Sequence, residues 1–180
     1  MAGIIKVNQY QDFNGNTILT SDGSGNLTTQ KIMYPAFRAY RSSSQSITDN
    51  ADTKVQMDAI DFDTNSYYDN TTNYRYTPLV AGKYFVSTQV TCGSSTEEDV
   101  HFALVYIYKN GSVNSKNIVD PHNGSKSNQS SNYFSNIITM NGTTDYLEIY
   151  ARIDTSSGTP SIGGESDSTR TYFSAYRIGS

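Results

Sequence analysis

Few residues of this 180-residue chain have the types and spacing that catalysis requires. The two histidines, His101 and His122, stand in no metal-ligand spacing, and no Ser-His-Asp or Cys-His set stands out along the chain. His101 begins an apolar segment and is expected to be a structural residue with satisfied hydrogen bonds. His122 lies in a polar segment and is expected to be a loop residue. The sequence therefore predicts a protein that is not an enzyme and has no cofactor.

The acidic run Glu97-Glu98-Asp99 is the one cluster that could carry chemistry. Carboxylate oxygens held together can bind calcium, and an acidic pair could act in a polysaccharide depolymerase. The alternative is a solvated acidic turn, which we favour because charged residues gather in surface loops. Glu97, Glu98 and Asp99 are therefore kept as calcium candidates, with no resident metal predicted.

Charge and cysteine content narrow the class of protein further. Cys92 is the only cysteine, so an internal disulfide is excluded and a small buried strand residue is expected. A net charge of −4 disfavours non-specific binding to nucleic acid. Neither a secretory signal nor an apolar run of about 18 residues is present, which predicts synthesis in a host cytoplasm and no membrane insertion.

The composition favours β-structure. Fifteen tyrosines and seven phenylalanines accompany many Ser, Thr, Asn and Gly residues, and no segment shows apolar residues at helical spacing. The segment Tyr67–Val90 shows the clearest pattern of turns and strands, and the rest of the chain is interpreted around it. It contains a polar turn, a corner at Pro78 and Gly82, and then a strand in which Tyr84, Val86 and Val90 alternate with polar residues.

Several short motifs carry a family resemblance. Tyr68-Asp69, Tyr76-Thr77-Pro78, Ala81-Gly82-Lys83-Tyr84-Phe85 and Lys109-Asn110-Gly111 resemble the globular head domain of complement component one, subunit q. The family usually has Phe where Tyr76 stands. The resemblance implies an all-β, antiparallel two-sheet jelly-roll sandwich, shared with tumour necrosis factor, over residues 35–180. It also implies that the first and last strands pair at the centre of a sheet.

The remaining head strands follow from alternating or dense apolar residues. The expected strands are 35–41, 54–57, 60–63, 101–108, 133–140, 146–153 and 171–178, with a weak one at 117–119. In the first of them, Phe37 and Ala39 are expected to share one face and Arg38 and Tyr40 the other. The segments 42–53, 112–132 and 155–169 are expected to be polar loops or largely so. Because loops on a rigid scaffold commonly carry binding, the polar segments 64–73, 112–132 and 155–169 are expected to meet a host surface or decorate the capsid.

Residues 1–34 form a different kind of segment, in which short strands alternate with Asp/Asn/Gly turns. Strands are expected at 4–7, 17–20 and 27–32, and the segment is too short to be stable alone. It is therefore expected to pair with copies of itself or to dock on a partner. The segment resembles N-terminal parts of bacteriophage tail and fibre proteins. It is treated as a β-rich stem whose virion-attachment candidates are Ile4, Ile5, Val7, Ile18, Leu19 and Leu27.

Many tyrosines fall on the outward positions of the expected head strands. A monomer rarely exposes so much aromatic surface, and members of the complement-head family close a threefold axis with such residues. The resemblance therefore implies a homotrimer. The candidate interface residues are Tyr40, Tyr106, Tyr108, Tyr146, Tyr150, Tyr172 and Tyr176.

Together these features favour a trimeric virion structural protein of a bacteriophage, of the fibre, spike or capsid-decoration type. The stem would anchor it through other virion proteins, and the head would face solvent to recognise a host-surface glycan or protein, or to stabilise the particle. The alternative is a bacterial cell-surface or spore-coat adhesion module with the same head, which a collagen-like stem would favour; none is present.

Overall fold

The computed structural model describes residues 7–29, 34–97, 99–120 and 127–180. The chain divides into two compact units, Met1–Tyr34 and Pro35–Ser180. We call them the stem and the head. All regular structure in the described ranges is β-strand, and they contain no helix able to cross a membrane.

The stem is a three-stranded antiparallel sheet. Strand β2 (Thr17–Ser21) lies between β1 (Gln9–Gln11) and β3 (Leu27–Thr29). Two turns of the same design join the strands: Asp12 accepts hydrogen bonds from two backbone amides and a side-chain amide of the turn that follows it, and Asp22 does likewise. These local bonds set the turns that the Asp/Asn/Gly pattern predicts.

The stem strands differ in part from those expected. The 17–20 strand and the turns on either side of it are confirmed, and β3 covers the first part of the predicted 27–32 strand. The predicted 4–7 strand lies outside the described residues except for Val7, which is not in a strand. The first described strand begins two residues later, at Gln9.

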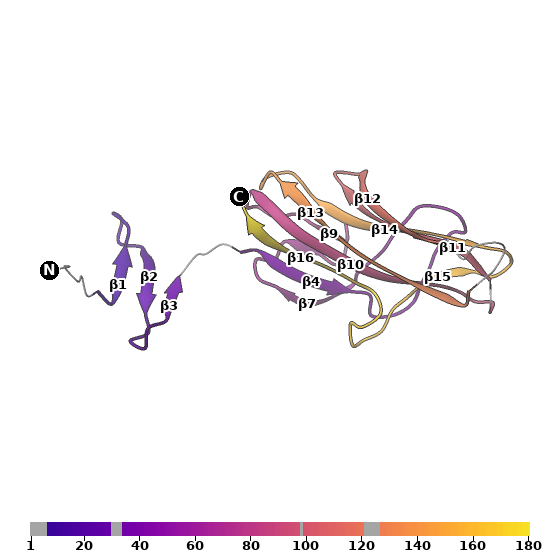
Figure 1. Ribbon diagram of the computed structural model, residues 1–180, viewed down its shortest axis with the longest axis horizontal. Helices are drawn as coiled ribbons and strands as arrows, with labels where there is room; N and C mark the ends of the chain where they lie inside the picture. Colours follow the sequence, from indigo (N-terminus) through magenta and orange to yellow (C-terminus); the bar gives the residue numbers. More distant parts are fainter. Residues whose placement is uncertain (1–6, 30–33, 98, 121–126) are drawn as a thin grey trace. The chain divides into compact units, whose positions relative to one another are not determined.

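The head consists of two antiparallel sheets, as the sequence predicts. In the seven-stranded sheet, the long strand β10 (Gly82–Ser94) pairs with β13 (Gln129–Met140) along one edge (Figure 1). Its other edge pairs with β16 (Tyr172–Gly179) and then with β15 (Pro160–Gly163). The remaining members are β4 (Ala36–Tyr40), β5 (Gln45–Ser46) and β7 (Ala59–Asp63). The expected pairing of the first and last head strands is confirmed by β4 and β16.

The six-stranded sheet is built on β11 (Val100–Lys109) and β14 (Leu147–Thr155), which pair along most of their length. Strand β12 (Ser112–Val119) extends the sheet beside β11. The other members are β6 (Thr53–Lys54), β8 (Tyr68–Asp69) and β9 (Arg75–Tyr76). The β11–β12 turn has positive φ at both Asn110 and Gly111, which is the hairpin geometry that an Asn-Gly pair favours.

The core lies between the two sheets and is centred on aromatic rings. Phe37 stacks on Tyr76 with ring centroids 4.1 Å apart and meets Phe173 edge-on. The predicted alternation holds, because Phe37 and Ala39 are buried while Arg38 and Tyr40 are partly exposed. Tyr84, Val86 and Val90 of β10 are likewise buried. The head therefore packs through the period-two pattern that the sequence displays.

Three segments predicted as loops contain strands. The 42–53 segment contains β5, the 112–132 segment contains all of β12 and the start of β13, and the 155–169 segment contains β15. In β15 only Ile162 is a large apolar residue, and it is fully buried. Pairing with β10, rather than an apolar pattern of its own, makes this segment a strand.

Gly82 begins β10 with φ of +148°, in the region where side chains are rarely tolerated. A Cβ placed there would collide with the carbonyl oxygen of Gly179 and approach Nε of Arg177 to 2.6 Å. We expect Gly82→Ala to lower the free energy of unfolding by about 1–3 kcal/mol, measured by urea denaturation. Gly179→Ala is the control, since a Cβ at Gly179 would meet nothing within 4 Å. Equal free energies of unfolding for Gly82→Ala and Gly179→Ala would show that a side chain at Gly82 causes no strain.

Candidate functional site

The outer surface of the seven-stranded sheet carries a group of exposed apolar side chains. Its members are 44–56% exposed and come from β7, β13 and β16. Together with the partly exposed Phe85 of β10, they are called here the apolar face: Phe62, Phe85, Tyr133, Ile137, Tyr176 and Ile178.

The strand register aligns this face in rows. Ile137, Phe85 and Tyr176 stand directly opposite one another on β13, β10 and β16, and the Phe85 and Tyr176 rings are 5.4 Å apart. The next row is made of Ser135, Ser87 and Ser174, whose side chains are small. An exposed apolar surface of this kind on adjacent strands is typical of a protein–protein contact.

The seven tyrosines predicted for the interface do not share one surface. Tyr40, Tyr172 and Tyr176 lie on the outer side of the seven-stranded sheet. Tyr176 belongs to the apolar face, and the partly exposed Tyr172 stands in one row with Tyr133 of that face. The other four belong to the six-stranded sheet or its immediate end: Tyr106, Tyr108, Tyr146 and Tyr150. Sequence reasoning missed the apolar residues Phe85, Tyr133 and Ile137. Their outward parity in β10 and β13 was the signal that could have found them.

Three tyrosines of the six-stranded sheet, Tyr106, Tyr108 and Tyr150, pack against one another. Tyr108 stacks on Tyr150 at 4.2 Å and meets Tyr106 edge-on. The Tyr108 hydroxyl also donates to Asp52, which pairs with Arg152 at 2.8 Å. Partial burial, followed by the charge of Asp52, raises the pKa of Tyr106 to about 12. Tyr106 is therefore covered within the head, whereas Tyr108 and Tyr150 remain partly exposed.

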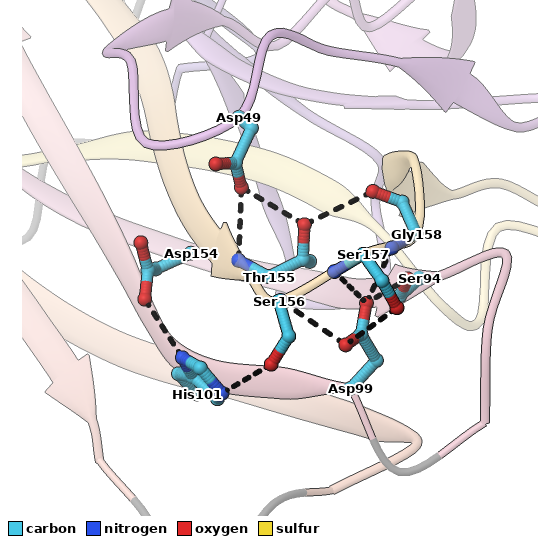
Figure 2. Close-up of polar contacts among 9 residues, drawn as sticks. All are labelled: Asp49, Ser94, Asp99, His101, Asp154, Thr155, Ser156, Ser157 and Gly158. Carbon is cyan, nitrogen blue, oxygen red and sulfur yellow. Dashed lines mark hydrogen bonds and ion pairs between the residues drawn. The ribbon is translucent and has the colours of Figure 1, made fainter.

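The solvated acidic turn that was favoured is wrong for Asp99. Asp99 is only 2% exposed, and its carboxylate binds the turn that follows β14 (Figure 2). It accepts hydrogen bonds from the backbone amides of Ser156, Ser157 and Gly158, and from the Ser94 hydroxyl. Glu97 is exposed, and Glu98 lies outside the described residues. Asp99 thus joins the β10–β11 connection to the β14–β15 connection.

This clamp makes stability depend on pH. Desolvation raises the pKa of Asp99, but the hydrogen bonds from Gly158, Ser157, Ser94 and Ser156 outweigh it and lower the pKa to about 2. Because the folded pKa is depressed, its stabilisation is present above the unfolded pKa of about 4 and is lost as pH falls towards 2. We expect Asp99→Asn to unfold at lower urea than the wild type at pH 7, with the difference vanishing near pH 2. A gap independent of pH would contradict this origin.

A histidine, an aspartate and a serine that are scattered in the sequence meet beside the Asp99 clamp. Nδ1 of His101 lies 3.1 Å from a carboxylate oxygen of Asp154, and Nε2 lies 2.7 Å from Oγ of Ser156 (Figure 2). This is the connectivity of a nucleophile, its base and the group that orients the base. The spacing of these residues along the chain did not reveal the set. The pairing of β11 with β14 brings them together in the fold.

The surroundings of this trio do not support acyl transfer. Catalysis by a serine needs donors, commonly backbone amides, that point at the developing oxyanion. Here the amides of Ser156, Ser157 and Gly158 all donate to Asp99. Asp99 also places a negative charge where a second one would form. Both ring nitrogens of His101 are hydrogen-bonded, as the prediction of a satisfied structural residue requires. The trio therefore braces the turn.

The other predicted residues are placed as follows. In the stem, Val7 and Ile18 are about half exposed and Leu19 is partly buried, while Ile4 and Ile5 lie outside the described residues. Leu27 begins β3. His122 is likewise outside the described residues. Cys92 is fully buried, as predicted, and burial raises the pKa of its thiol to about 12, which removes it from thiolate chemistry at neutral pH. Within the described ranges no three His, Cys, Asp or Glu side chains gather as metal ligands.

Comparison with solved structures decides the fold. Murine APRIL superposes with a TM-score of 0.56 at 11% identity, covering 81% of this chain and 99% of the other. The globular domain of zebrafish complement 1qA superposes with a TM-score of 0.56 at 15% identity, covering 80% and 96%. The head has the complement-head and tumour necrosis factor fold. This complement-head fold is the one that the Tyr76–Phe85 and Lys109–Gly111 motifs led us to expect.

A third solved structure, Eiger TNF from S. frugiperda, superposes with a TM-score of 0.50 at 10% identity and covers 81% of this chain and 92% of that one. No protein-family model and no curated protein sequence matches the chain. At these identities the likeness establishes the complement-head fold and leaves the function to be argued from the surfaces of the head and the stem.

Proposed function

We propose that this protein is a non-enzymatic homotrimer whose heads associate through the apolar face. The single observation that carries the proposal is the registered row Ile137–Phe85–Tyr176 across three adjacent strands. Ile137 and Tyr176 are at least half exposed in one copy of the chain, so a further copy is the partner that would cover them. The resemblance to complement-head and tumour necrosis factor proteins, which are commonly trimeric, supports the same assembly.

We further propose that the trimer is a structural component of a bacteriophage virion, of the fibre, spike or decoration type. The stem is a separate compact unit of short strands with exposed Val7, Tyr10, Phe13 and Ile18. Such a small sheet with apolar residues in solvent needs a covering surface to be stable. Docking on another virion protein supplies that surface, and the head then faces the host surface or stabilises the particle.

The experiment compares the full chain with a head comprising residues 35–180. Light scattering should return about three times 19.9 kDa for the full chain, and a trimer for the head as well. An antibody raised against the head should label particles released from the producing cells. The same antibody should find no head on particles when residues 1–34 are deleted, although the trimer persists. A monomeric full chain would overturn the assembly, and stem-independent labelling would overturn the anchor.

A further inference from the structure

A hollow of about 370 Å³ opens beside the hairpin formed by β8 and β9, at one end of the six-stranded sheet. None of its lining residues belongs to the apolar face. Its volume falls within the range of small-ligand sites. The side chains that matter for its chemistry are Ser66, Tyr67, Asn73, Arg75, Thr77 and Leu79.

Arg75 is the cationic residue among those that line this hollow. Its guanidinium stacks on the Tyr146 ring, with the central carbon 4.6 Å from the ring centroid. Across the described ranges, no hydrogen bond or ion pair engages its N–H groups. Stacking therefore holds the guanidinium in place while its donors remain available, which lowers the entropic cost of binding a ligand.

The same hollow presents acceptors and apolar surface. Asn73 donates its amide N–H to Asp69, which leaves its Oδ1 as an acceptor. Ser66, Tyr67 and Thr77 contribute hydroxyl groups, each both donor and acceptor. The Tyr67 ring, packed against the core, and the Leu79 side chain, 57% exposed, add apolar surface. The ligand must therefore combine hydroxyl groups with an apolar face.

The charges of the residues that line the hollow favour a neutral ligand over an anionic or a cationic one. Asp69 also lines the hollow, and its carboxylate accepts five hydrogen bonds, all from Thr71, Thr72 and Asn73. The backbone bonds from Thr72 and Thr71, the largest contributions, hold the pKa of Asp69 well below its usual range. Asp69 is therefore an anion whose oxygens are already occupied. Its charge offsets that of Arg75, so the hollow is close to neutral.

We propose that this hollow is a binding site for a neutral pyranose residue of a surface glycan. The Tyr67 ring meets the apolar face of the sugar, Arg75 donates to its hydroxyl oxygens, and Asn73 accepts from a hydroxyl group. This inference rests on the proposed role in host recognition and places the site at the β8–β9 hairpin, partly within the 64–73 segment that was expected to carry binding. A single sugar that covers so open a hollow should bind with a Kd of about 1 mM.

The test titrates the full chain with the methyl pyranosides of glucose, galactose, mannose and N-acetylglucosamine, followed by protein NMR. At least one sugar should saturate and shift the side-chain signal of Arg75. Arg75→Met keeps the apolar stem and should weaken Kd about ten-fold or more. Thr77→Val keeps the shape and should weaken it to a smaller extent. Arg152→Met, which removes an arginine of the same sheet outside the hollow, should leave Kd unchanged.

Each outcome bears on the site itself. Failure of all four sugars to saturate would overturn the proposal, and so would unchanged binding by Arg75→Met and Thr77→Val variants whose spectra show them folded. These results are separate from the proposed assembly and anchoring, which are read by light scattering and by labelling of particles. A trimeric, particle-bound protein that binds no sugar would leave that function in place and remove only this site.

Discussion

Ile137→Asp should convert the proposed trimer to monomers. Ile137 is 56% exposed in one copy of the head and ends the registered row Ile137–Phe85–Tyr176 of the apolar face, opposite Phe85. If heads associate through this face, the variant buries an unpaired carboxylate in every subunit, and the effective penalty for such a charge is several kcal/mol per ion. The mass measured by light scattering should fall from about three times 19.9 kDa to 19.9 kDa.

The chain supplies a matched control for this substitution. Ile118 in β12 is 53% exposed and lies in the six-stranded sheet, and it is not a member of the apolar face. Ile118→Asp introduces the same charge at a strand position of similar exposure. Both variants should therefore lose a similar free energy, within about 1 kcal/mol, from the lower β-propensity of Asp. The control should remain a trimer. If both variants stay trimeric the apolar face is not the interface, and if only Ile118→Asp dissociates, the six-stranded sheet is.

Phe37→Ala should nearly unfold the head. The Phe37 side chain is fully buried and contacts three rings, with centroid distances of 4.1 Å to Tyr76, 4.8 Å to Phe173 and 5.1 Å to Tyr68. Removing a buried phenylalanine costs about 3–5 kcal/mol, which is a large part of the 5–15 kcal/mol that stabilises a typical domain. Urea denaturation followed by circular dichroism should show a midpoint shifted far towards low urea.

Leu79→Ala serves as the comparison for Phe37→Ala. Leu79 is 57% exposed and outside the buried core, so its truncation should change the free energy of unfolding by no more than about 0.5 kcal/mol. If Phe37→Ala lowered the free energy of unfolding by less than about 1.5 kcal/mol, the aromatic cluster would have to relax around the vacated volume. The head would then depend less on Phe37 than its three ring contacts indicate.

Local patterns in the sequence were sufficient for much of the fold. The alternation of Tyr84, Val86 and Val90 predicted the buried face of β10, and the Asn110-Gly111 pair predicted the turn that ends β11. These features depend on neighbours one to four residues apart, where side-chain direction and turn preference are set by the backbone itself. The family motifs added the complement-head fold and the pairing of β4 with β16.

The sequence could not assign outward-facing side chains to a surface. Alternation says whether Tyr108 or Tyr176 points away from the core, but the two tyrosines lie on different sheets of the head. Sheet membership depends on which strands pair, and those partners are far apart along the chain. The predicted set of seven interface tyrosines was therefore divided between two sheets, and Phe85 and Ile137 were missed.

The polar sites were decided by the tertiary structure alone. Asp99 is a charged residue in an acidic run, and only the approach of the β14–β15 turn supplies the backbone amides that make its burial favourable. His101, Asp154 and Ser156 meet because β11 pairs with β14. The sequence by itself thus determined strands, turns and the inward face of the head. Contacts between distant segments decided the rest, because their free energy depends on three-dimensional proximity that no local pattern encodes.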